Sequence, residues 1–152
     1  MAAMRYYFAY GSNMDADQMA SRCPGSLFVG RARLLSHSFL INERGVASVM
    51  LAQDRVTHGL LWTITPPDEV ALDGHEGVAK GFYFKEAFPV YPDDGSEAVQ
   101  ALIYIASSDR PGAPRPGYLE RIIRAAREHG FAREYIAELE SWSGDKVNWS
   151  PV

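Results

Sequence analysis

The chain has 152 residues, of which 47% are hydrophobic and 22% are charged, so it is long enough for one domain with a sizeable core. Its net charge of −4 gives no electrostatic reason to expect a nucleic acid or an anionic membrane as a partner. No apolar run approaches the roughly 20 residues of a membrane span, and the first residues lack the pattern of a signal peptide. The single cysteine, Cys23, favours a cytoplasmic protein. We expect one domain over residues 1–152, with residues 140–152 as a loosely packed tail.

The first half of the chain predicts mostly strands. An apolar strand at residues 5–10 leads to a short helix at 15–22, which Asn13 or Asp15 caps, and then to a turn at 23–25. Alternating apolar runs predict four more strands, at 27–35, 37–42, 47–53 and 58–64. Residues 65–77 predict a short helix, because Pro66 and Pro67 suit its first turn and Gly74 or Gly77 can end it.

The second half adds two strands, at 82–92 and 99–106, with a hairpin-type loop at 93–95 between them. A proline-rich segment at 110–117 must be extended or turned. Two amphipathic helices follow, at 118–130 and 132–142. Consecutive strands without intervening helices favour an α+β fold: a small mixed, mostly antiparallel β-barrel flanked by helices. The step from the first strand to the first helix is the place where a parallel pair could arise.

The stretch "YFAYGSNM" at residues 7–14 ends a buried strand abruptly in small and hydrogen-bonding residues. Gly11 allows a ligand to approach the backbone closely, and Ser12 and Asn13 can begin a helix whose first N–H groups are free to bind an anion or an oxyanion. The stretch is neither a phosphate-binding P-loop nor GxGxxG. A tight turn with a helix cap and a ligand-binding loop both remain open at this stage.

Glu76 is the candidate proton-transfer residue. It lies beside His75 and between Gly74 and Gly77, a spacing that predicts a bent backbone rather than a regular helix. A partly desolvated carboxylate there would have a raised pKa and could shuttle protons. A simply solvated Glu76 is the alternative, and Asp73 is the nearby competitor.

Other chemistry has weaker support. The histidines are scattered singly, so no metal site is expected, and no Ser/His/Asp triad is apparent. Arg121, Arg124 and Arg127 predict a solvated helix face. Tyrosines are plentiful beside strand ends, and each alone is more typical of a core with a satisfied hydroxyl. The best placed is Tyr118, which a proline-stiffened segment delivers to the start of a helix.

Three segments together resemble the gamma-glutamylcyclotransferases: "YFAYGSNM", "LDGHEGVAKGFY" and "PRPGYLERIIRAAREHGFAREYIAEL". Their order and approximate spacing match, and the resemblance runs from about Tyr6 to Leu139. The first motif alone is shared by the wider group of cyclotransferase-like proteins, whereas the second and third narrow the match. The third resembles the type that acts on gamma-glutamyl amino acids, and the first loop differs from that of the glutathione-specific branch.

The resemblance implies a small barrel with a cavity beside the Tyr-Gly-Ser-Asn loop. It implies a cofactor-independent enzyme of glutathione metabolism, of lyase or acyltransferase type, that releases 5-oxoproline from a small-molecule gamma-glutamyl substrate. Glu76 would be the acid/base. The residues implied to bind the substrate are Tyr7, Phe8, Ala9, Tyr10, Gly11, Ser12, Asn13, Tyr83 and Tyr118, with Tyr104 as a weaker candidate.

The sequence departs from the animal members just before Glu76, where "DGH" replaces the acidic or amide residues expected. The loop "SSDRPGAP" is a second place where contacts to the departing amine could differ. Three interpretations stay open: a cyclotransferase for gamma-glutamyl amino acids or amines, a biosynthetic cyclotransferase that removes a gamma-glutamyl protecting group, and a non-catalytic binding protein. Trp142 and Trp149 leave a homodimer as an open expectation.

Overall fold

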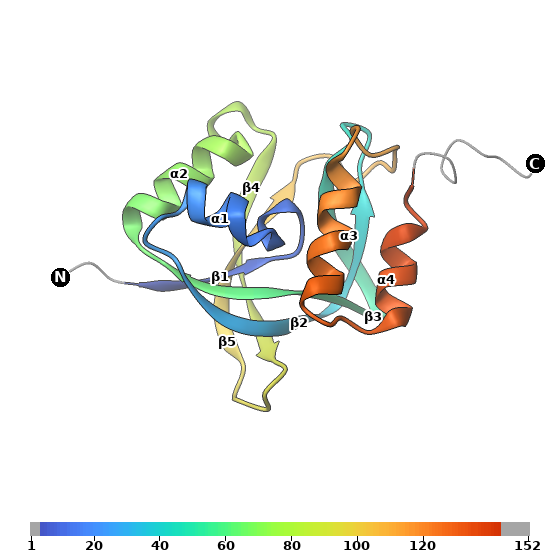
Figure 1. Ribbon diagram of the computed structural model, residues 1–152. Coiled ribbons are helices and arrows are strands. Elements are labelled where there is room, and N and C mark those ends of the chain that lie inside the picture. Colours follow the sequence, from blue (N-terminus) through green and yellow to red (C-terminus); the bar gives the residue numbers. More distant parts are fainter. Residues whose placement is uncertain (1–3, 144–152) are drawn as a thin grey trace, which may run out of the picture.

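A computed structural model describes residues 4–143 of the chain (Figure 1). Five strands form a closed barrel in the order β1-β3-β2-β4-β5. The strands are β1 (Arg5–Ala9), β2 (Leu27–Ile41), β3 (Ala47–Ile64), β4 (Tyr83–Pro92) and β5 (Val99–Ala106). Paired strands are antiparallel except β1 and β5, which pair in parallel. The expected α+β fold, a small mixed and mostly antiparallel barrel, is confirmed, although the parallel pair joins the first and last strands.

Helices flank the barrel on its outside (Figure 1). They are α1 (Ala16–Arg22), α2 (Pro66–Glu76), α3 (Tyr118–Glu128) and α4 (Arg133–Glu140), with 3-10 helices η1 (Ser12–Met14) and η2 (Val78–Lys80). Asp15 caps α1, because its carboxylate accepts from the N–H groups of Asp17 and Gln18. The apolar stripe of α3 is buried at Leu119 and Ile122, as its 3.6-residue period predicts.

The prediction of four strands between residues 27 and 64 is wrong, because the chain forms two long strands there. The backbone bends inside β2 at Ser36, with φ 61, and inside β3 at Asp54, with φ 65. At Ser36 the pairing register also shifts, between Leu35 and His37. Short polar side chains tolerate this left-handed conformation better than most residues. Ser36 and Asp54, polar residues that interrupt the apolar pattern, therefore mark bends that curve the sheet, and each strand continues through its bend.

The bends in β2 and β3 help the sheet to close into a barrel. β2 pairs with β3 along its length and also reaches β4, where Ala32 and Arg33 face Pro92 and Tyr91. A single curved strand can thus contact two neighbours and help close a barrel of only five strands. The interior is filled by apolar side chains that are almost fully buried, including Phe8, Leu34, Phe39, Leu60, Leu102 and Ile103.

At the C-terminal end, Trp142 is half-buried and packs against the core. Residues 144–152, which include Trp149 and most of the tail expected to be loosely packed, lie outside the described residues. Between residues 4 and 143, no helix is both long enough and apolar enough to span a bilayer.

Candidate active site

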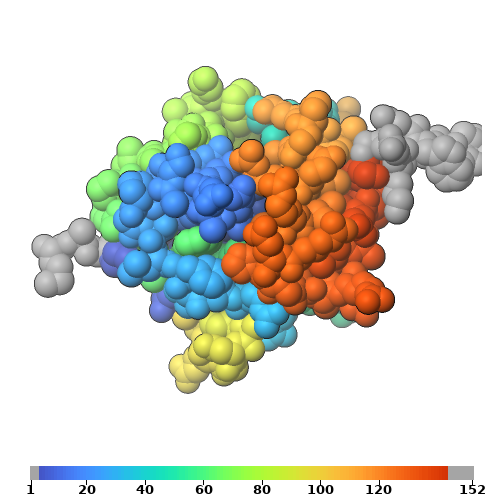
Figure 2. Space-filling view, in the orientation of Figure 1, coloured from blue at the N-terminus to red at the C-terminus, as the bar shows by residue number. Residues whose placement is uncertain are grey.

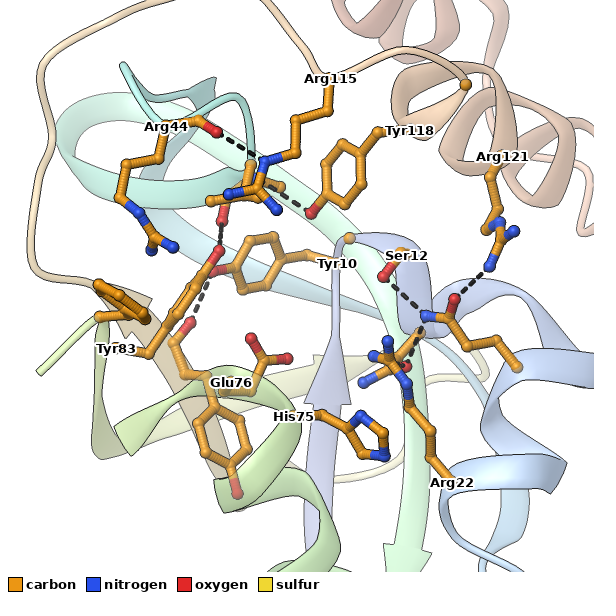
Figure 3. A pocket seen from close by; sticks show the side chains of 18 of the residues that line it. Tyr10, Ser12, Arg22, Arg44, His75, Glu76, Tyr83, Arg115, Tyr118 and Arg121 are labelled. Atoms are coloured by element: carbon orange, nitrogen blue, oxygen red, sulfur yellow. Dashed lines mark hydrogen bonds between the residues drawn. The ribbon is translucent and has the colours of Figure 1, made fainter. Parts of the chain in front are cut away.

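One cavity, of about 450 Å³, gathers most of the residues that the sequence singled out. It opens where the loop after β1 meets the end of α2 and the start of α3 (Figure 3). On the surface, the N-terminal segment and α3 lie against each other (Figure 2), and Arg121 Nη1 on α3 donates a hydrogen bond to Gln18 Oε1 on α1 across this seam. Segments more than 100 residues apart in the chain therefore build one site.

The loop after β1 forms part of the cavity wall. Buried Asn13 donates from Nδ2 to Tyr7 Oη at 3.0 Å, and its Oδ1 accepts from Gln18 Nε2 at 2.9 Å and from Arg22 Nη1 at 3.2 Å. Gln18 Nε2 also lies 2.7 Å from Ser12 Oγ. Ser12 and Asn13 therefore begin a short 3-10 helix and are held by α1, while the cap of α1 is Asp15 and not Asn13.

Gly11 lies close to Ala47, at the start of β3, and to Tyr118. A Cβ added at Gly11 would lie 3.3 Å from Ala47 Cβ and 3.4 Å from Tyr118 Oη. These separations are tighter than ordinary van der Waals contact. Glycine therefore allows the loop, β3 and α3 to approach one another beside the cavity.

Glu76 is the last residue of α2, and its carboxyl group points into the cavity (Figure 3). The expected bend on both sides of Glu76 is wrong, since Gly74 and His75 are inside α2. The bend falls at Gly77, a left-handed residue with φ 67 whose N–H satisfies the last helical carbonyls. Helical geometry thus fixes the direction of the Glu76 side chain, and the left-handed conformation of Gly77 ends the helix directly after it.

Burial raises the pKa of Glu76 to about 7, while the nearby positive charge of Arg22 opposes part of that rise. The half-buried carboxyl group has no hydrogen-bond partner within residues 4–143. Its competitor Asp73 is engaged by the barrel instead: Tyr104 Oη donates to Asp73 Oδ1 at 2.6 Å, and Lys85 Nζ lies 3.1 Å from Oδ2. Of these two carboxylates, only Glu76 is both in the cavity and unengaged.

Two tyrosines form hydrogen bonds to the backbone of Ala47, one as a donor and the other as an acceptor. Tyr83 Oη donates to the carbonyl oxygen of Ala47 at 2.6 Å, and Tyr118 Oη accepts from the N–H of Ala47 at 3.0 Å. The Tyr118 hydroxyl proton therefore stays available to a ligand, whereas Tyr83 offers oxygen lone pairs. Burial raises the pKa of Tyr118 to about 12 and also raises that of Tyr83, so both phenols are neutral near pH 7.

Almost all of the substrate-binding residues predicted from the sequence lie on this cavity. Those that line it are Tyr7, Phe8, Tyr10, Gly11, Ser12, Asn13, Tyr83 and Tyr118, together with Glu76 and Tyr104. Ala9 does not: it is buried in β1 where that strand meets β3, and its carbonyl oxygen would lie 2.5 Å from a Cβ at Gly59. Tyr10 Oη donates to the Tyr104 carbonyl, which ties the loop to β5.

Sequence reasoning missed the positive charge of the site. Arg22, Arg44 and Arg115 line the cavity, and so does Arg121, which was expected on a solvated helix face. Between residues 4 and 143, none of Arg22, Arg44 and Arg115 forms an ion pair. A chain of net charge −4 therefore carries a basic cavity, which is suited to an anionic ligand. Arg115 reaches the cavity from the proline-rich segment at residues 110–117.

The part of the chain that the structure describes contains no cluster of metal-ligating side chains. No group of three or more His, Cys, Asp and Glu side chains is placed there to hold an ion. The chemistry on offer within the cavity is that of one carboxyl group with a raised pKa, neutral phenols, backbone amides and guanidinium groups.

Relatives match the chain over most of its length. It is 28% identical over 145 residues to the Gamma-glutamylcyclotransferase of Mus musculus and 26% identical to that of Homo sapiens, in both cases over 89% of this chain and 77% of the relative. A solved structure of a Gamma-glutamyl cyclotransferase superposes with a TM-score of 0.85 at 23% identity, covering 97% of this chain and 93% of that one, and so shares the fold. The pattern of the AIG2-like family matches residues 56–139, more than half of the chain and including Glu76, Tyr83 and Tyr118. The chain therefore belongs to the AIG2-like family.

Proposed function

We propose that this protein is a gamma-glutamyl cyclotransferase, which releases 5-oxoproline and a free amine from a gamma-glutamyl compound. The observation that carries the proposal is Glu76, an unengaged carboxyl group with a pKa raised to about 7, in a basic cavity beside the loop at residues 10–13. The names of the mouse and human relatives support the reaction type.

Glu76 has the properties that the first proton transfer needs. The alpha-amine of the substrate is an ammonium ion near neutral pH and must lose a proton before it can attack the gamma-carbonyl carbon. A base with a pKa near the working pH can take that proton and later return it. Attack forms the ring C–N bond. The attacking nitrogen then carries two protons and gives one of them up as the tetrahedral intermediate collapses and the original amide bond breaks. The departing amine takes that proton and the one held by Glu76, so it leaves as an ammonium ion.

The remaining wall would position the substrate. The attack is intramolecular, so folding the gamma-glutamyl chain into a near-attack shape supplies much of the rate. The negative charge on the intermediate needs hydrogen-bond donors. The first N–H groups of η1 after Gly11 and the free hydroxyl proton of Tyr118 are donors available in the cavity, and Arg22 can neutralise a carboxylate close to Glu76.

No nucleophilic side chain and no cofactor enters this scheme. The nucleophile is the substrate's own amine, the proton carrier is Glu76, and the charge is stabilised by groups of the chain. A biosynthetic enzyme that removes a gamma-glutamyl protecting group would use the same steps with a different amine. A non-catalytic binding protein would not require a carboxyl group with a raised pKa.

The test is 5-oxoproline release from gamma-glutamyl amino acids, gamma-glutamyl amines and glutathione. We expect Glu76→Gln to lower kcat by at least about 100-fold, because it removes the proton carrier, while the variant still binds substrate in calorimetry. Glu86→Gln, at an exposed carboxylate on β4, is the matched control and should leave turnover unchanged.

Two outcomes would contradict the proposal. Near-normal turnover in Glu76→Gln would remove Glu76 from the mechanism. Binding of gamma-glutamyl compounds by the wild type without any 5-oxoproline would favour the non-catalytic protein.

A further inference from the structure

Two side-chain amides, Gln18 and Asn13, connect α3 to the loop after β1; we call them the amide pair. Gln18, half-buried on α1, accepts from Arg121 Nη1 at its Oε1. Its Nε2 donates to Ser12 Oγ at 2.7 Å and to Asn13 Oδ1 at 2.9 Å. Asn13 in turn donates from Nδ2 to Tyr7 Oη at 3.0 Å. The hydrogen bonds drawn at Ser12 and at Arg121 in Figure 3 belong to this connected set.

Arginine fixes the direction of these hydrogen bonds. A guanidinium group has donors and no acceptor, so Arg121 can face only the oxygen of Gln18. The amide nitrogen of Gln18 must then point the other way, toward the loop. Arg22 orients Asn13 in the same manner, because its Nη1 donates to Asn13 Oδ1 at 3.2 Å. Neither amide can turn over without placing an N–H group against a guanidinium group.

The fixed direction decides what two hydroxyl groups can offer a ligand. Ser12 Oγ accepts from Gln18 and Tyr7 Oη accepts from Asn13, and between residues 4 and 143 neither hydroxyl has an acceptor for its own proton. Both residues line the cavity. Burial and the nearby Glu76 raise the pKa of Tyr7, so its phenol keeps the proton near neutral pH. Two hydroxyl protons thus remain available to an oxygen of a bound ligand.

Arg121 reaches the amide pair because of its place on α3. It follows Tyr118 by three residues, so the two side chains share the face of the first turn that borders the cavity. A second contact holds its guanidinium group, since Arg121 Nε lies 3.7 Å from Oδ2 of Asp15, the residue that caps α1. The docking of α3 on α1 is therefore what sets the direction of the hydrogen bonds in the loop.

We propose that Arg121 and Gln18 are positioning residues for the reaction, because they keep the hydroxyl protons of Ser12 and Tyr7 directed to the substrate. The inference rests on the proposed function, in which a carboxylate and a developing oxyanion both need donors. Neither positioning residue has to touch the reacting atoms, since each acts through a hydroxyl group of β1 or of the loop. Contact between α3 and α1 is then a condition for turnover as well as for folding.

The first test compares Gln18→Glu with Gln18→Met. Glutamate keeps the shape of the side chain and its contact to Arg121, but it has no N–H group, so Ser12 must donate its own proton to the carboxylate. Methionine removes the amide and leaves the Ser12 proton free. We expect kcat/KM to fall about 10- to 30-fold in Gln18→Glu and only about 2- to 5-fold in Gln18→Met. A merely structural role predicts the opposite order, because methionine loses every hydrogen bond of the amide.

The assay is 5-oxoproline release from gamma-glutamyl-alanine, gamma-glutamyl-ethylamide and glutathione, using the compound that the wild type turns over fastest. Each variant is measured across pH and compared at its own maximum. This comparison separates a loss of donors from a shifted pKa of Glu76, which the added charge of Gln18→Glu would cause. Urea unfolding of both variants shows whether their stabilities differ.

Ser12→Ala separates hydrogen-bond direction from charge. The negative charge of Gln18→Glu acts on the cavity whether or not position 12 carries a hydroxyl group. Without that hydroxyl no proton can be redirected, so in the Ser12→Ala background the two Gln18 variants should differ by less than about threefold. A difference that persists unchanged in this background would be an effect of charge and would overturn the inference.

The second test uses Arg121→Met and Arg121→Lys. Methionine lets the Gln18 amide turn over, whereas lysine can only donate and should preserve its orientation. We expect Arg121→Met to lower kcat/KM about 5- to 10-fold and Arg121→Lys to recover most of that loss. Arg124→Met is the matched control, because Arg124 is an exposed arginine of α3 that does not line the cavity, and it should leave kcat/KM unchanged.

The possible results separate this inference from the proposed function. Normal release of 5-oxoproline by the wild type with equal losses in Gln18→Glu and Gln18→Met would overturn the inference and leave the function standing. If Gln18→Met does not fold, wild-type rates in Arg121→Met would overturn the inference by themselves. Release from none of the three compounds by the wild type would overturn the proposed function itself.

Discussion

Glu76 shows how a single side chain can have opposite effects on stability and on proposed activity. Its ordinary pKa is 4.5, and burial at the end of α2 raises it to about 7. A carboxylate that is poorly solvated destabilises the folded state whenever it is ionised. The same poor solvation makes the group a suitable proton carrier near neutral pH.

The raised pKa predicts a pH-dependent gain of stability in Glu76→Gln. Between pH 4.5 and 7 the folded state holds a proton that the unfolded state has lost, so the free energy of unfolding of the wild type falls as pH rises through this window. Glutamine cannot ionise, so the variant avoids that fall. At 1.36 kcal/mol for each pKa unit, Glu76→Gln should become more stable than the wild type by up to about 3 kcal/mol above pH 7.

Urea unfolding at pH 4.5 and at pH 8 measures this difference. Glu86→Gln, at an exposed carboxylate on β4, is measured beside it as the control for replacing a carboxylate with an amide. A stability difference for Glu76→Gln that does not change between the two pH values would mean that the pKa of Glu76 is not raised, whatever the protein catalyses.

At the scale of elements, the helix α2 holds Glu76 in place. The helix begins in a capping box: Thr65 Oγ1 accepts from the Asp68 N–H at 3.3 Å, and Asp68 Oδ2 accepts from the Thr65 N–H at 3.0 Å. Asp68 Oδ1 also accepts from the Gly25 N–H at 3.2 Å. Near its other end, Asp73 ties α2 to β4 and β5 through Lys85 and Tyr104.

These contacts predict different effects for the two capping residues. Thr65→Ala should lower the free energy of unfolding by about 1 kcal/mol, the usual loss for a helix cap. Asp68→Ala should lower it further, because the N–H groups of both Thr65 and Gly25 lose the acceptor that the buried Asp68 carboxylate provides. Urea unfolding compares the two variants. Equal losses would mean that the contact to Gly25 contributes nothing.

At the scale of the whole molecule, the closed barrel links residues that are far apart in the chain. β1 pairs with β3 and, in parallel, with β5, so the barrel closes only when strands from both ends of the chain are in place. The helix α3 in turn contributes Tyr118, which accepts from Ala47 at the start of β3. Barrel, loop and helices share one core.

This shared core predicts one cooperative unfolding transition. Guanidinium titrations followed by far-UV circular dichroism and by tryptophan fluorescence should coincide, as for other single domains of this size. Trp62 in β3 is buried and reports on the barrel. Loss of helical signal at a lower denaturant concentration than the fluorescence change would show that α3 and α4 unfold separately and that the single-domain prediction is wrong.

The sequence by itself determined the features that depend on local physics. The periodicity of residues 118–130 predicted α3, Asp15 is one of the two residues expected to cap α1, and consecutive apolar runs indicated a mostly antiparallel barrel. The resemblance of three motifs to one family predicted site residues in the loop at residues 7–13 and at Glu76 and Tyr118. The structure places all of these residues on one cavity, apart from Ala9.

Only the tertiary structure decided the features that depend on contacts between distant residues. Ser36 and Asp54 bend two long strands where the sequence suggested four short ones, because a polar break looks the same in a bulge as in a turn. Four arginines line the cavity because distant segments dock against one another, as Gly45 does against Arg115. The pKa of Glu76 likewise depends on how much of the folded chain surrounds its carboxyl group, since desolvation is a property of packing rather than of neighbours in sequence.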